Sequence, residues 1–191
     1  MLDSKDRFAF GAGAPTEPRD VPPSLRNGNI NEGEIIETRP AASKLMETLA
    51  ARAEDAPVAA LIADYGHAES SAGDTLQGVR RHRFADPLAT PGEIDLTAHV
   101  DFAALRADAH DLGLATFGPM PQGEFLLKLG LASRCERLVE KARPDQKRAI
   151  LSGAARLADP RQMGVLFQML ALQTPGLAPP PPFADIARGL A

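Results

Sequence analysis

Six consecutive apolar residues, Val58 to Ala63, lead directly into the stretch Asp64-Tyr-Gly-His67. A short run rich in Val, Leu and Ile is typical of a strand that is buried on both faces, as the strands of parallel sheets are. The sequence therefore predicts a covered, parallel strand over residues 58–65. Ligands of open α/β sheets bind beyond the carboxyl ends of the strands. The polar residues after the run are therefore expected where a site would form.

Strand and helix patterns alternate around this run, which indicates an α/β fold with helices packed on the sheet. The predicted neighbours are helices over residues 40–54 and 101–112 and strands over residues 33–37 and 114–117. Asp101 is expected to cap the second helix and Gly113 to end it. Gly118-Pro119 is expected to stop the strand that follows.

The last third of the chain predicts helices and then a tail. The helices are expected to begin near residues 123, 133, 144 and 160. Ser133 and Glu136 have the spacing of a capping box, and apolar positions predict that the fourth helix continues through Leu170. Prolines are dense between residues 175 and 182. Residues 173–191 are therefore expected to form an extended, mobile, Pro-rich tail.

Two stretches lack strong periodicity. Residues 66–96 predict a long functional loop with short local structure. Residues 1–32 predict an irregular segment with a hairpin-type turn at 27–29. Gly11-Ala-Gly13 is not expected to bind a nucleotide, because such a loop opens into a helix and four prolines follow by residue 23.

Composition excludes several classes of protein. A hydrophobic fraction of 44% and a charged fraction of 24% are ordinary for one globular domain. The net charge of −4 gives no basic field for nucleic acid, and no apolar run approaches the roughly 20 residues that span a bilayer. The single cysteine, Cys135, suits a reducing compartment.

Acids and histidines are dense between residues 64 and 110. No His-Glu-x-x-His or Cys-x-x-Cys motif is present, so scattered caps and loop hydrogen bonds are favoured over a metal site. No serine lies on a Gly-x-Ser-x-Gly elbow. The basic cluster Arg80-Arg-His-Arg83 is either a set of solvated loop charges or a recognition element for an acidic partner. The residues alone indicate an α/β domain with a site near 64–102 and leave its chemistry open.

Several motifs in order resemble one family. They are Gly33-Glu-Ile-Ile-Glu37, Asp64-Tyr-Gly-His67, Gly73-Asp-Thr-Leu-Gln77, His82, Pro91-Gly-Glu-Ile-Asp-Leu-Thr-Ala-His-Val-Asp-Phe102, Gly118-Pro-Met-Pro-Gln-Gly-Glu-Phe-Leu126, Leu129-Gly-Leu131, Arg134 and Met163-Gly164. No single motif is specific, but the ordered set, which covers roughly residues 30–170, resembles the MidA family of class I S-adenosylmethionine-dependent methyltransferases.

The resemblance implies a Rossmann-like methyltransferase sheet and methyl transfer from S-adenosylmethionine to an arginine of a protein, a subunit of respiratory complex I. It implies a bacterial cytoplasmic or mitochondrial matrix location. The family's glycine-rich cofactor loop belongs before the matched region and is not found here. The chain is therefore expected to be the carboxyl-terminal half, with residues 33–172 as part of the methyltransferase domain and with the later strands and the terminal helices.

This departure has consequences for function. The chain alone is expected to be inactive and not to bind S-adenosylmethionine, and a missing amino-terminal half is a possible partner along an exposed sheet edge. The alternative is a non-catalytic protein-binding module derived from the same fold. An unrelated hydrolase or metal enzyme is disfavoured by the order of the motifs.

The resemblance also implies site residues at the matched positions. The predicted catalytic residues are Asp64, Tyr65, His67, Asp95 and His99. The predicted substrate-side residues are Asp74, Thr75, His82, Asp101, Gln122 and Gly123. For four of them a purely structural role is left open: Asp64 as a cap of local backbone, Asp101 as a helix cap, and Gln122 and Gly123 in a turn.

Overall fold

The computed structural model describes residues 7–14, 17, 21–26 and 30–184. The predicted turn at 27–29 and the last part of the tail, 185–191, lie outside the described residues. Internal contacts divide the chain into two units. Residues 1–40 and 70–99 form one, here called the small-sheet unit, and residues 41–69 and 100–191 form the other, here called the core unit. Each unit is described by itself.

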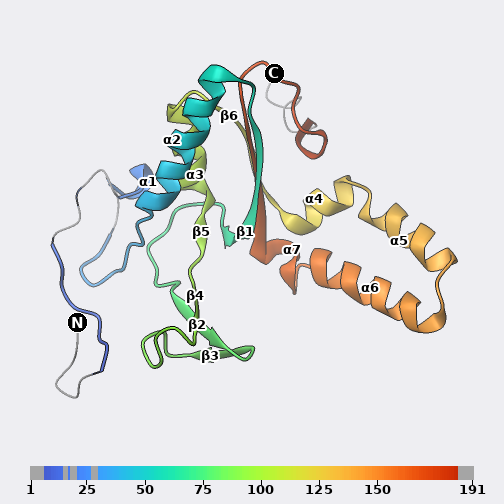
Figure 1. Cartoon of the computed structure of the whole chain (residues 1–191), viewed down its shortest axis with the longest axis horizontal. Helices are drawn as coiled ribbons and strands as arrows, with labels where there is room; N and C mark the ends of the chain where they lie inside the picture. Colours follow the sequence, from blue (N-terminus) through green and yellow to red (C-terminus); the bar gives the residue numbers. More distant parts are fainter. Residues whose placement is uncertain (1–6, 15–16, 18–20, 27–29, 185–191) are drawn as a thin grey trace. The chain divides into compact units, whose positions relative to one another are not determined.

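A four-stranded sheet in the order β5-β1-β7-β6 organises the core unit (Figure 1). The strands are β1 (Ala59–His67), β5 (Val100–Asp101), β6 (Ala115–Pro121) and β7 (Phe167–Gln173). β7 is antiparallel to both of its neighbours, whereas β1 and β5 are parallel. The last strand in sequence therefore lies between two earlier ones.

Helices α2 (Pro40–Asp55) and α3 (Phe102–Asp111) cover one face of this sheet. Their buried residues Met46, Phe102 and Leu105 form one core with Leu170 and Leu172 of β7. Both helices were predicted, and they pack on the sheet as expected. Their amphipathic patterns place the apolar side on the strands and the charged side in water.

The other face carries a second core, made by β6, β7 and the segment after β7. Met120, Met169 and Ala171 pack with Phe125 and Phe183. Phe183 ends a short 3₁₀ helix, η2 (Pro181–Phe183), and is fully buried. The prediction of an extended, mobile tail is therefore wrong for this part, because the aromatic ring anchors the chain in the core.

The central prediction holds in part. Residues 59–67 form a strand, but that strand is not covered on both faces. It is also not parallel over the predicted range, since residues 59–65 pair antiparallel with β7 and only Gly66 and His67 pair parallel with β5. Ala60 and Ile62 pack toward the first core, whereas the side chain of Leu61 on the opposite face is 54% exposed. Apart from β7, the described residues pair β1 only through β5, at Gly66 and His67, so the stretch 59–65 is an open edge. The strand that is buried on both faces is β7.

Two sequence predictions fail around β6 and β7. Local periodicity predicted a helix from 160 through 170, but α7 (Met163–Leu166) is short and the chain then enters β7. The position between two strands overrides the helical pattern, since it provides partners for backbone and side chains on both sides. Strand β6 also continues past Gly118-Pro119, because a register shift between Phe117 and Met120 lets pairing resume.

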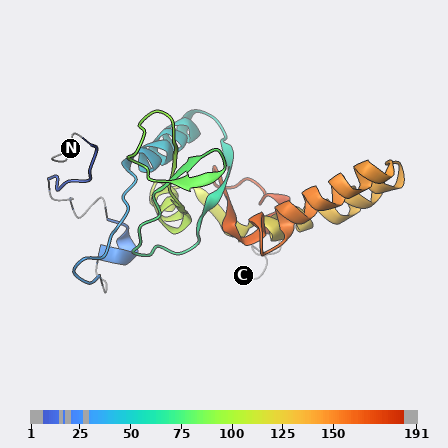
Figure 2. The same ribbon diagram turned by 90° about the horizontal axis from the view of Figure 1, so that it is seen from below.

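The helices between β6 and β7 form an arm that leads away from the sheet (Figures 1 and 2). They are α4 (Gln122–Lys128), α5 (Leu131–Glu140) and α6 (Pro144–Ala158), followed by α7. The predicted capping box at Ser133 is wrong, since α5 begins at Leu131 after a left-handed Gly130. Neither α5 nor α6 buries a residue. The described part of the chain has no helix that combines the length and apolarity needed to cross a membrane.

The small-sheet unit is built on three antiparallel strands in the order β3-β2-β4. They are β2 (Gln77–Arg80), β3 (Arg83–Ala85) and β4 (Asp95–Thr97), and the unit also holds the short helix α1 (Pro23–Arg26). This sheet occupies the stretch predicted as a long loop. The strand predicted at 33–37 is wrong: the segment is irregular, although the carbonyl of Ile35 accepts a hydrogen bond from the N–H of Gly73 at 2.8 Å.

Candidate active site

The carboxyl end of β1 is held against β5 by a very close backbone approach. Gly66 lies opposite Val100, and His67 lies opposite Asp101. A Cβ atom added to Gly66 would lie 2.0 Å from the carbonyl oxygen of Val100. Only glycine fits this contact. The glycine of the Asp-Tyr-Gly-His motif therefore sets the spacing that brings His67 beside Asp101.

Asp101 is a buried carboxylate that serves two neighbours. Its side chain is the N-cap of α3, with Oδ1 accepting the N–H of Ala104 at 2.9 Å. Its Oδ2 lies 3.9 Å from Nε2 of His67. The residue is 1% exposed. The predicted cap is confirmed, and the second oxygen faces the imidazole of His67.

Asp64 and Tyr65 begin this end of the strand. The Oδ1 atom of Asp64 accepts the N–H of Tyr65 at 2.8 Å, so the carboxylate caps its own strand. The ring of Tyr65 packs edge-on against Phe167, with the ring centroids 5.7 Å apart. Asp64 makes no other side-chain hydrogen bond to a described residue. One carboxylate oxygen is therefore available to a ligand.

Gln168 lies directly opposite Asp64 on β7, and Pro121 of β6 lies on its other side. Gln168 is 6% exposed. Its Nε2 donates to the carbonyl of Val165 at 2.9 Å, but its buried Oε1 has no hydrogen-bond partner among the described residues. Buried amide oxygens are rarely left unpaired. Sequence reasoning missed this residue, although a lone glutamine within the apolar run Val165–Leu172 was a signal.

Gln122 and Gly123 follow β6 at the same edge of the sheet as the first residues of α4, and both contact the end of α6. Nε2 of Gln122 donates to the carbonyl of Leu157 at 2.9 Å. A Cβ atom on Gly123 would lie 2.5 Å from the carbonyl oxygen of Ala158. These contacts show that both residues hold the arm in place, and their predicted substrate-side role stays a prediction.

The small-sheet unit holds the remaining predicted residues, and Thr75 links two segments of it. The hydroxyl of Thr75 donates to Oε2 of Glu37 at 2.5 Å, and its N–H donates to Oε1 at 2.9 Å. The same hydroxyl accepts the N–H of His99 at 2.9 Å. Glu37 was not among the predicted site residues, yet it ties the irregular 33–37 segment to this network.

The other predicted residues of this unit are not brought into one cluster. Asp95 lies on β4 opposite Val79, and Asp74 is exposed. His82 is in the turn between β2 and β3. Six of the predicted residues therefore share the carboxyl edge of the core sheet, whereas Thr75 and His99 form a separate hydrogen-bonded link. The six are Asp64, Tyr65, His67, Asp101, Gln122 and Gly123.

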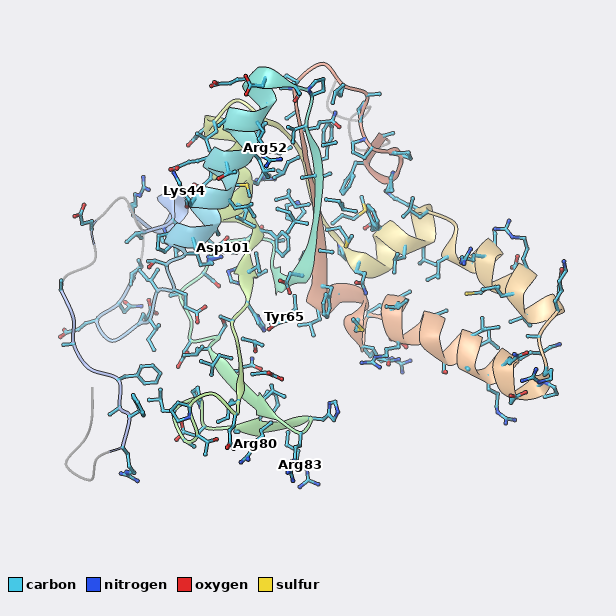
Figure 3. All side chains as sticks on the ribbon, viewed as in Figure 1. Lys44, Arg52, Tyr65, Arg80, Arg83 and Asp101 are labelled. Atoms are coloured by element: carbon cyan, nitrogen blue, oxygen red, sulfur yellow. The ribbon has the colours of Figure 1, made fainter. Side chains whose placement is uncertain are left out.

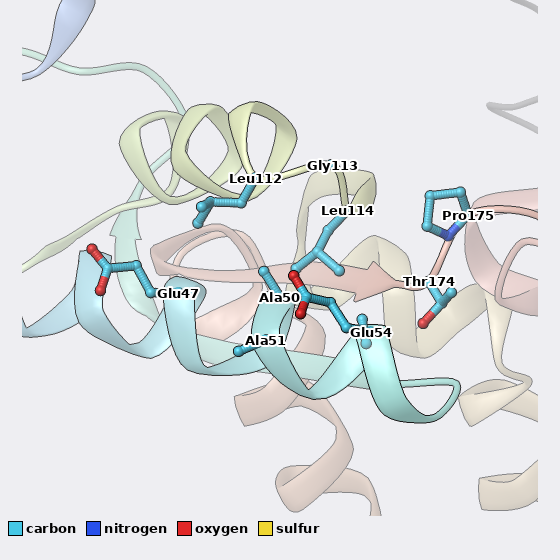
Figure 4. Close-up of a pocket in the computed structure, with 10 residues that line it drawn as sticks. Glu47, Ala50, Ala51, Glu54, Leu112, Gly113, Leu114, Thr174 and Pro175 are labelled. Atoms are coloured by element: carbon cyan, nitrogen blue, oxygen red, sulfur yellow. The ribbon is translucent and has the colours of Figure 1, made fainter.

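The described residues contain no group of three His, Cys, Asp or Glu side chains that could hold a metal ion. A hollow lies between α2 and the end of α3 (Figure 4). It is beside Thr174, at the other end of β7 from Gln168, the strand partner of Asp64. Its lining includes Glu47, Glu54 and Thr174, and the Thr174 hydroxyl already accepts the N–H of Val58 at 2.9 Å. This hollow therefore does not extend the candidate site.

Comparisons with known sequences match the chain to one family and to named relatives. A family model described as "Putative S-adenosyl-L-methionine-dependent methyltransferase" matches residues 2–120. The mitochondrial protein arginine methyltransferase NDUFAF7 of Mus musculus is 40% identical over 140 residues, which is 73% of this chain and 32% of that protein. Its Drosophila melanogaster homologue is 40% identical over 143 residues, which is 71% of this chain and 32% of the relative. The chain thus spans about a third of the length of these relatives.

Two solved structures from Burkholderia thailandensis share the fold. A COG1565 superfamily protein superposes with a TM-score of 0.74 and 27% identity, covering 90% of this chain and 46% of that protein. A second COG1565 member, bound to S-adenosyl-homocysteine, has a TM-score of 0.71 and 27% identity, covering 90% of this chain and 45% of that one. The predicted class I methyltransferase-like α/β fold and the resemblance to the MidA family are confirmed, and the chain belongs to this family of S-adenosyl-L-methionine-dependent methyltransferases.

Proposed function

We propose that this chain supplies the acceptor side of a methyltransferase that transfers a methyl group from S-adenosylmethionine to an arginine of a protein. The observation that carries the proposal is the carboxyl edge of β1, where Asp64, Gln168 and the His67–Asp101 pair gather in a chain of this family. The names of the relatives support a protein arginine as the acceptor. A respiratory complex I subunit as that protein, and a mitochondrial matrix or bacterial cytoplasmic location, are proposals from the resemblance.

The described residues fit only part of the cofactor's needs. A nucleoside cofactor of this kind is held by a glycine turn that opens into a helix, with an acid for the ribose. Among the described residues, the next helix after Gly13 is the four-residue α1 at Pro23–Arg26, and an added Cβ on Gly13 would meet nothing within 4 Å. We infer that the chain alone does not bind the cofactor and is inactive by itself. We therefore assign no methyl-transfer step to this chain without a second half.

The residues at the edge suit an arginine acceptor. A guanidinium offers five N–H donors in a planar fork and pairs well with carboxylates. In this proposal, the free oxygen of Asp64 and the unpaired Oε1 of Gln168 each accept a guanidinium N–H. Such bonds orient the nitrogen lone pair and disperse the charge as the nitrogen is alkylated. In this proposal His67, which lies 3.9 Å from the buried Asp101, takes up the proton that the guanidinium loses.

The missing contacts are proposed to come from an amino-terminal half that docks on β1. The outer edge of β1 at residues 59–65 has no strand partner among the described residues, and the side chain of Leu61 in this stretch is 54% exposed. An open strand edge is a template for another strand. In this proposal residues 33–172 are the carboxyl-terminal part of the methyltransferase domain, flanked by residues 1–32 and 173–191.

Calorimetry with S-adenosyl-homocysteine tests this function. The chain alone is expected to show no binding, and a mixture with the separately made amino-terminal part of a NDUFAF7 relative is expected to bind and to methylate an arginine peptide. In the mixture, Asp64→Asn should lower turnover at least about tenfold with an unchanged unfolding midpoint. Micromolar binding by the chain alone would contradict the inferred loss of cofactor contacts.

A non-catalytic protein-binding module is the second candidate, and the incomplete cofactor contacts favour it. The same mixture separates the two functions. The binding module is the better description if the two halves associate but the mixture neither binds S-adenosyl-homocysteine nor methylates the peptide, while this chain still binds the acceptor protein.

A further inference from the structure

The hairpin of β2 and β3 gathers three locally unfavourable features at one tip. Its two-residue turn, Arg81-His82, has φ values of 52° and 62°. Positive φ at both central residues is the geometry that Asn-Gly normally provides, because larger side chains are strained there. Strained backbone of this kind concentrates at functional sites. The residues in this turn therefore suggest a role beyond joining two strands.

Like charges also face each other across the hairpin. Arg80 and Arg83 are directly opposite in the β2–β3 ladder, an arrangement that opposes pairing. Figure 3 shows both side chains extending outward from the end of the hairpin. The guanidinium of Arg80 is bonded to Glu93, whereas no ion pair with a described residue involves Arg81 or Arg83. Arg80, Arg81 and Arg83 line a shallow hollow.

An exposed aromatic ring completes the tip. Phe84 follows Arg83 on β3 and is 82% exposed, the most exposed large apolar side chain among the described residues. The ring lies on the opposite face of β3 from the Arg83 side chain, because successive strand residues alternate. Since β3 is an edge strand, two free guanidinium groups and an exposed ring on its two faces match a partner that packs along this edge and presents both carboxylates and an apolar side chain. Nucleic acid fits less well, because its sites use a wider basic surface and the chain carries a net charge of −4.

We propose that the hairpin tip, Arg80 to Phe84, is a recognition element for an acidic protein segment that contains an apolar residue. On the proposed function above, on which this identification rests, that segment belongs to the acceptor protein. The hairpin would then select the substrate, whereas the edge of the core sheet would act on it. The two free guanidinium groups supply charge selectivity, and the Phe84 ring supplies apolar contact.

Fluorescence anisotropy with the full chain tests this inference. The probe is a short labelled peptide with several glutamates, one leucine and one arginine, and its twin carries glutamine in place of every glutamate. The acidic peptide is expected to bind at least about tenfold more tightly than the twin, as two charge-assisted contacts allow. Arg81→Gln/Arg83→Gln should lose about tenfold in affinity. The matched control, Arg137→Gln/Arg148→Gln on α5 and α6, should stay within about twofold.

Arg81→Asn/His82→Gly keeps the result interpretable if the first variant folds poorly. Asn-Gly suits the turn, so this variant should unfold at a higher temperature and still bind the acidic peptide more weakly than the wild type. Equal affinity for the two peptides, unchanged affinity in both hairpin variants, or tighter binding of a single-stranded oligonucleotide of equal charge would overturn the inference. The assay contains no cofactor and no second half. Failure to methylate in the reassembled enzyme therefore leaves this inference standing, and failure here leaves the proposed methyl transfer standing.

Discussion

Gly66→Ala tests whether one backbone contact builds the candidate site. The new Cβ would lie 2.0 Å from the carbonyl oxygen of Val100, so β1 and β5 must separate by about 1 Å or more to reach an ordinary contact. The two strands pair at only two positions. The separation should cost the ladder hydrogen bonds, at about 1 kcal/mol each, and should weaken the Asp101 cap, worth about 1 kcal/mol. Replacing glycine by alanine also reduces the conformational entropy of the unfolded chain, which offsets about 0.5 kcal/mol of this loss.

The expected net loss is about 2–3 kcal/mol in the free energy of unfolding, or roughly 5–10 °C in the midpoint for a chain of this size. Urea unfolding followed by circular dichroism measures it. Gly153→Ala is the matched control, because a Cβ atom there meets nothing within 4 Å in the interior of α6. It should stabilise the chain by about 0.5–1 kcal/mol. A loss below about 0.5 kcal/mol for Gly66→Ala would refute the argument that this glycine sets the spacing of the two strands.

Three further predictions concern single side chains. Asp101→Asn keeps an oxygen that can accept the N–H of Ala104, so it should destabilise the chain less than Asp101→Ala does. Asp101→Ala should cost about 1–2 kcal/mol or more in the free energy of unfolding, measured by thermal unfolding. Equal losses would show that the charge of Asp101, and not its capping bond, stabilises this site. Leu61→Lys places a charge on the exposed face of β1 and should reduce self-association in sedimentation velocity runs. The free energy of unfolding should change by no more than about 0.5 kcal/mol. Unchanged self-association would mean that this face of β1 does not mediate it. Hydrogen bonds from Arg161 lower the pKa of Asp159 to about 2. Because that pKa is depressed, the stabilisation is complete above the unfolded value near pH 4 and is lost as the pH falls toward 2. The urea midpoints of the wild type and Arg161→Gln should therefore differ at pH 6 and converge as the pH falls from 4 to 2.

The sequence predicted the elements whose signals are local. Helices α2, α3, α4 and α6 were found because an apolar stripe, a cap or a terminal glycine fixes each of them within one turn. The Asp101 cap was found in the same way. The motif at residues 64–67 was placed correctly at the end of a strand, since an apolar run that ends in polar residues depends little on distant contacts.

The misses depend on partners that lie far away in the sequence. β7 pairs with β1 over seven positions, from Ala59↔Gln173 to Tyr65↔Phe167, so it is buried on both faces despite a helix-like pattern. A strand buried on both faces was predicted for residues 58–65, but β7 is the strand that has this property. Gln168 was missed for the same reason: only the register shows that it lies opposite Asp64. The role of Phe183 likewise depends on the second core, which no local pattern reveals.

The position of β7 bears on how a partial sheet could work with a second half. Because β7 lies between β1 and β6, the two cores of this unit both pack on β7, and neither relies on the outer edge of β1. A second half that docks on residues 59–65 would therefore meet an edge that is already folded, and the ordering cost of binding would fall mainly on that half. Asp64 lies at the end of the open stretch, opposite Gln168. A strand added there parallel to β1 would bring its own carboxyl end beside Asp64, so the cofactor contacts proposed for the second half and the acceptor contacts proposed for this chain would meet along one edge of one sheet.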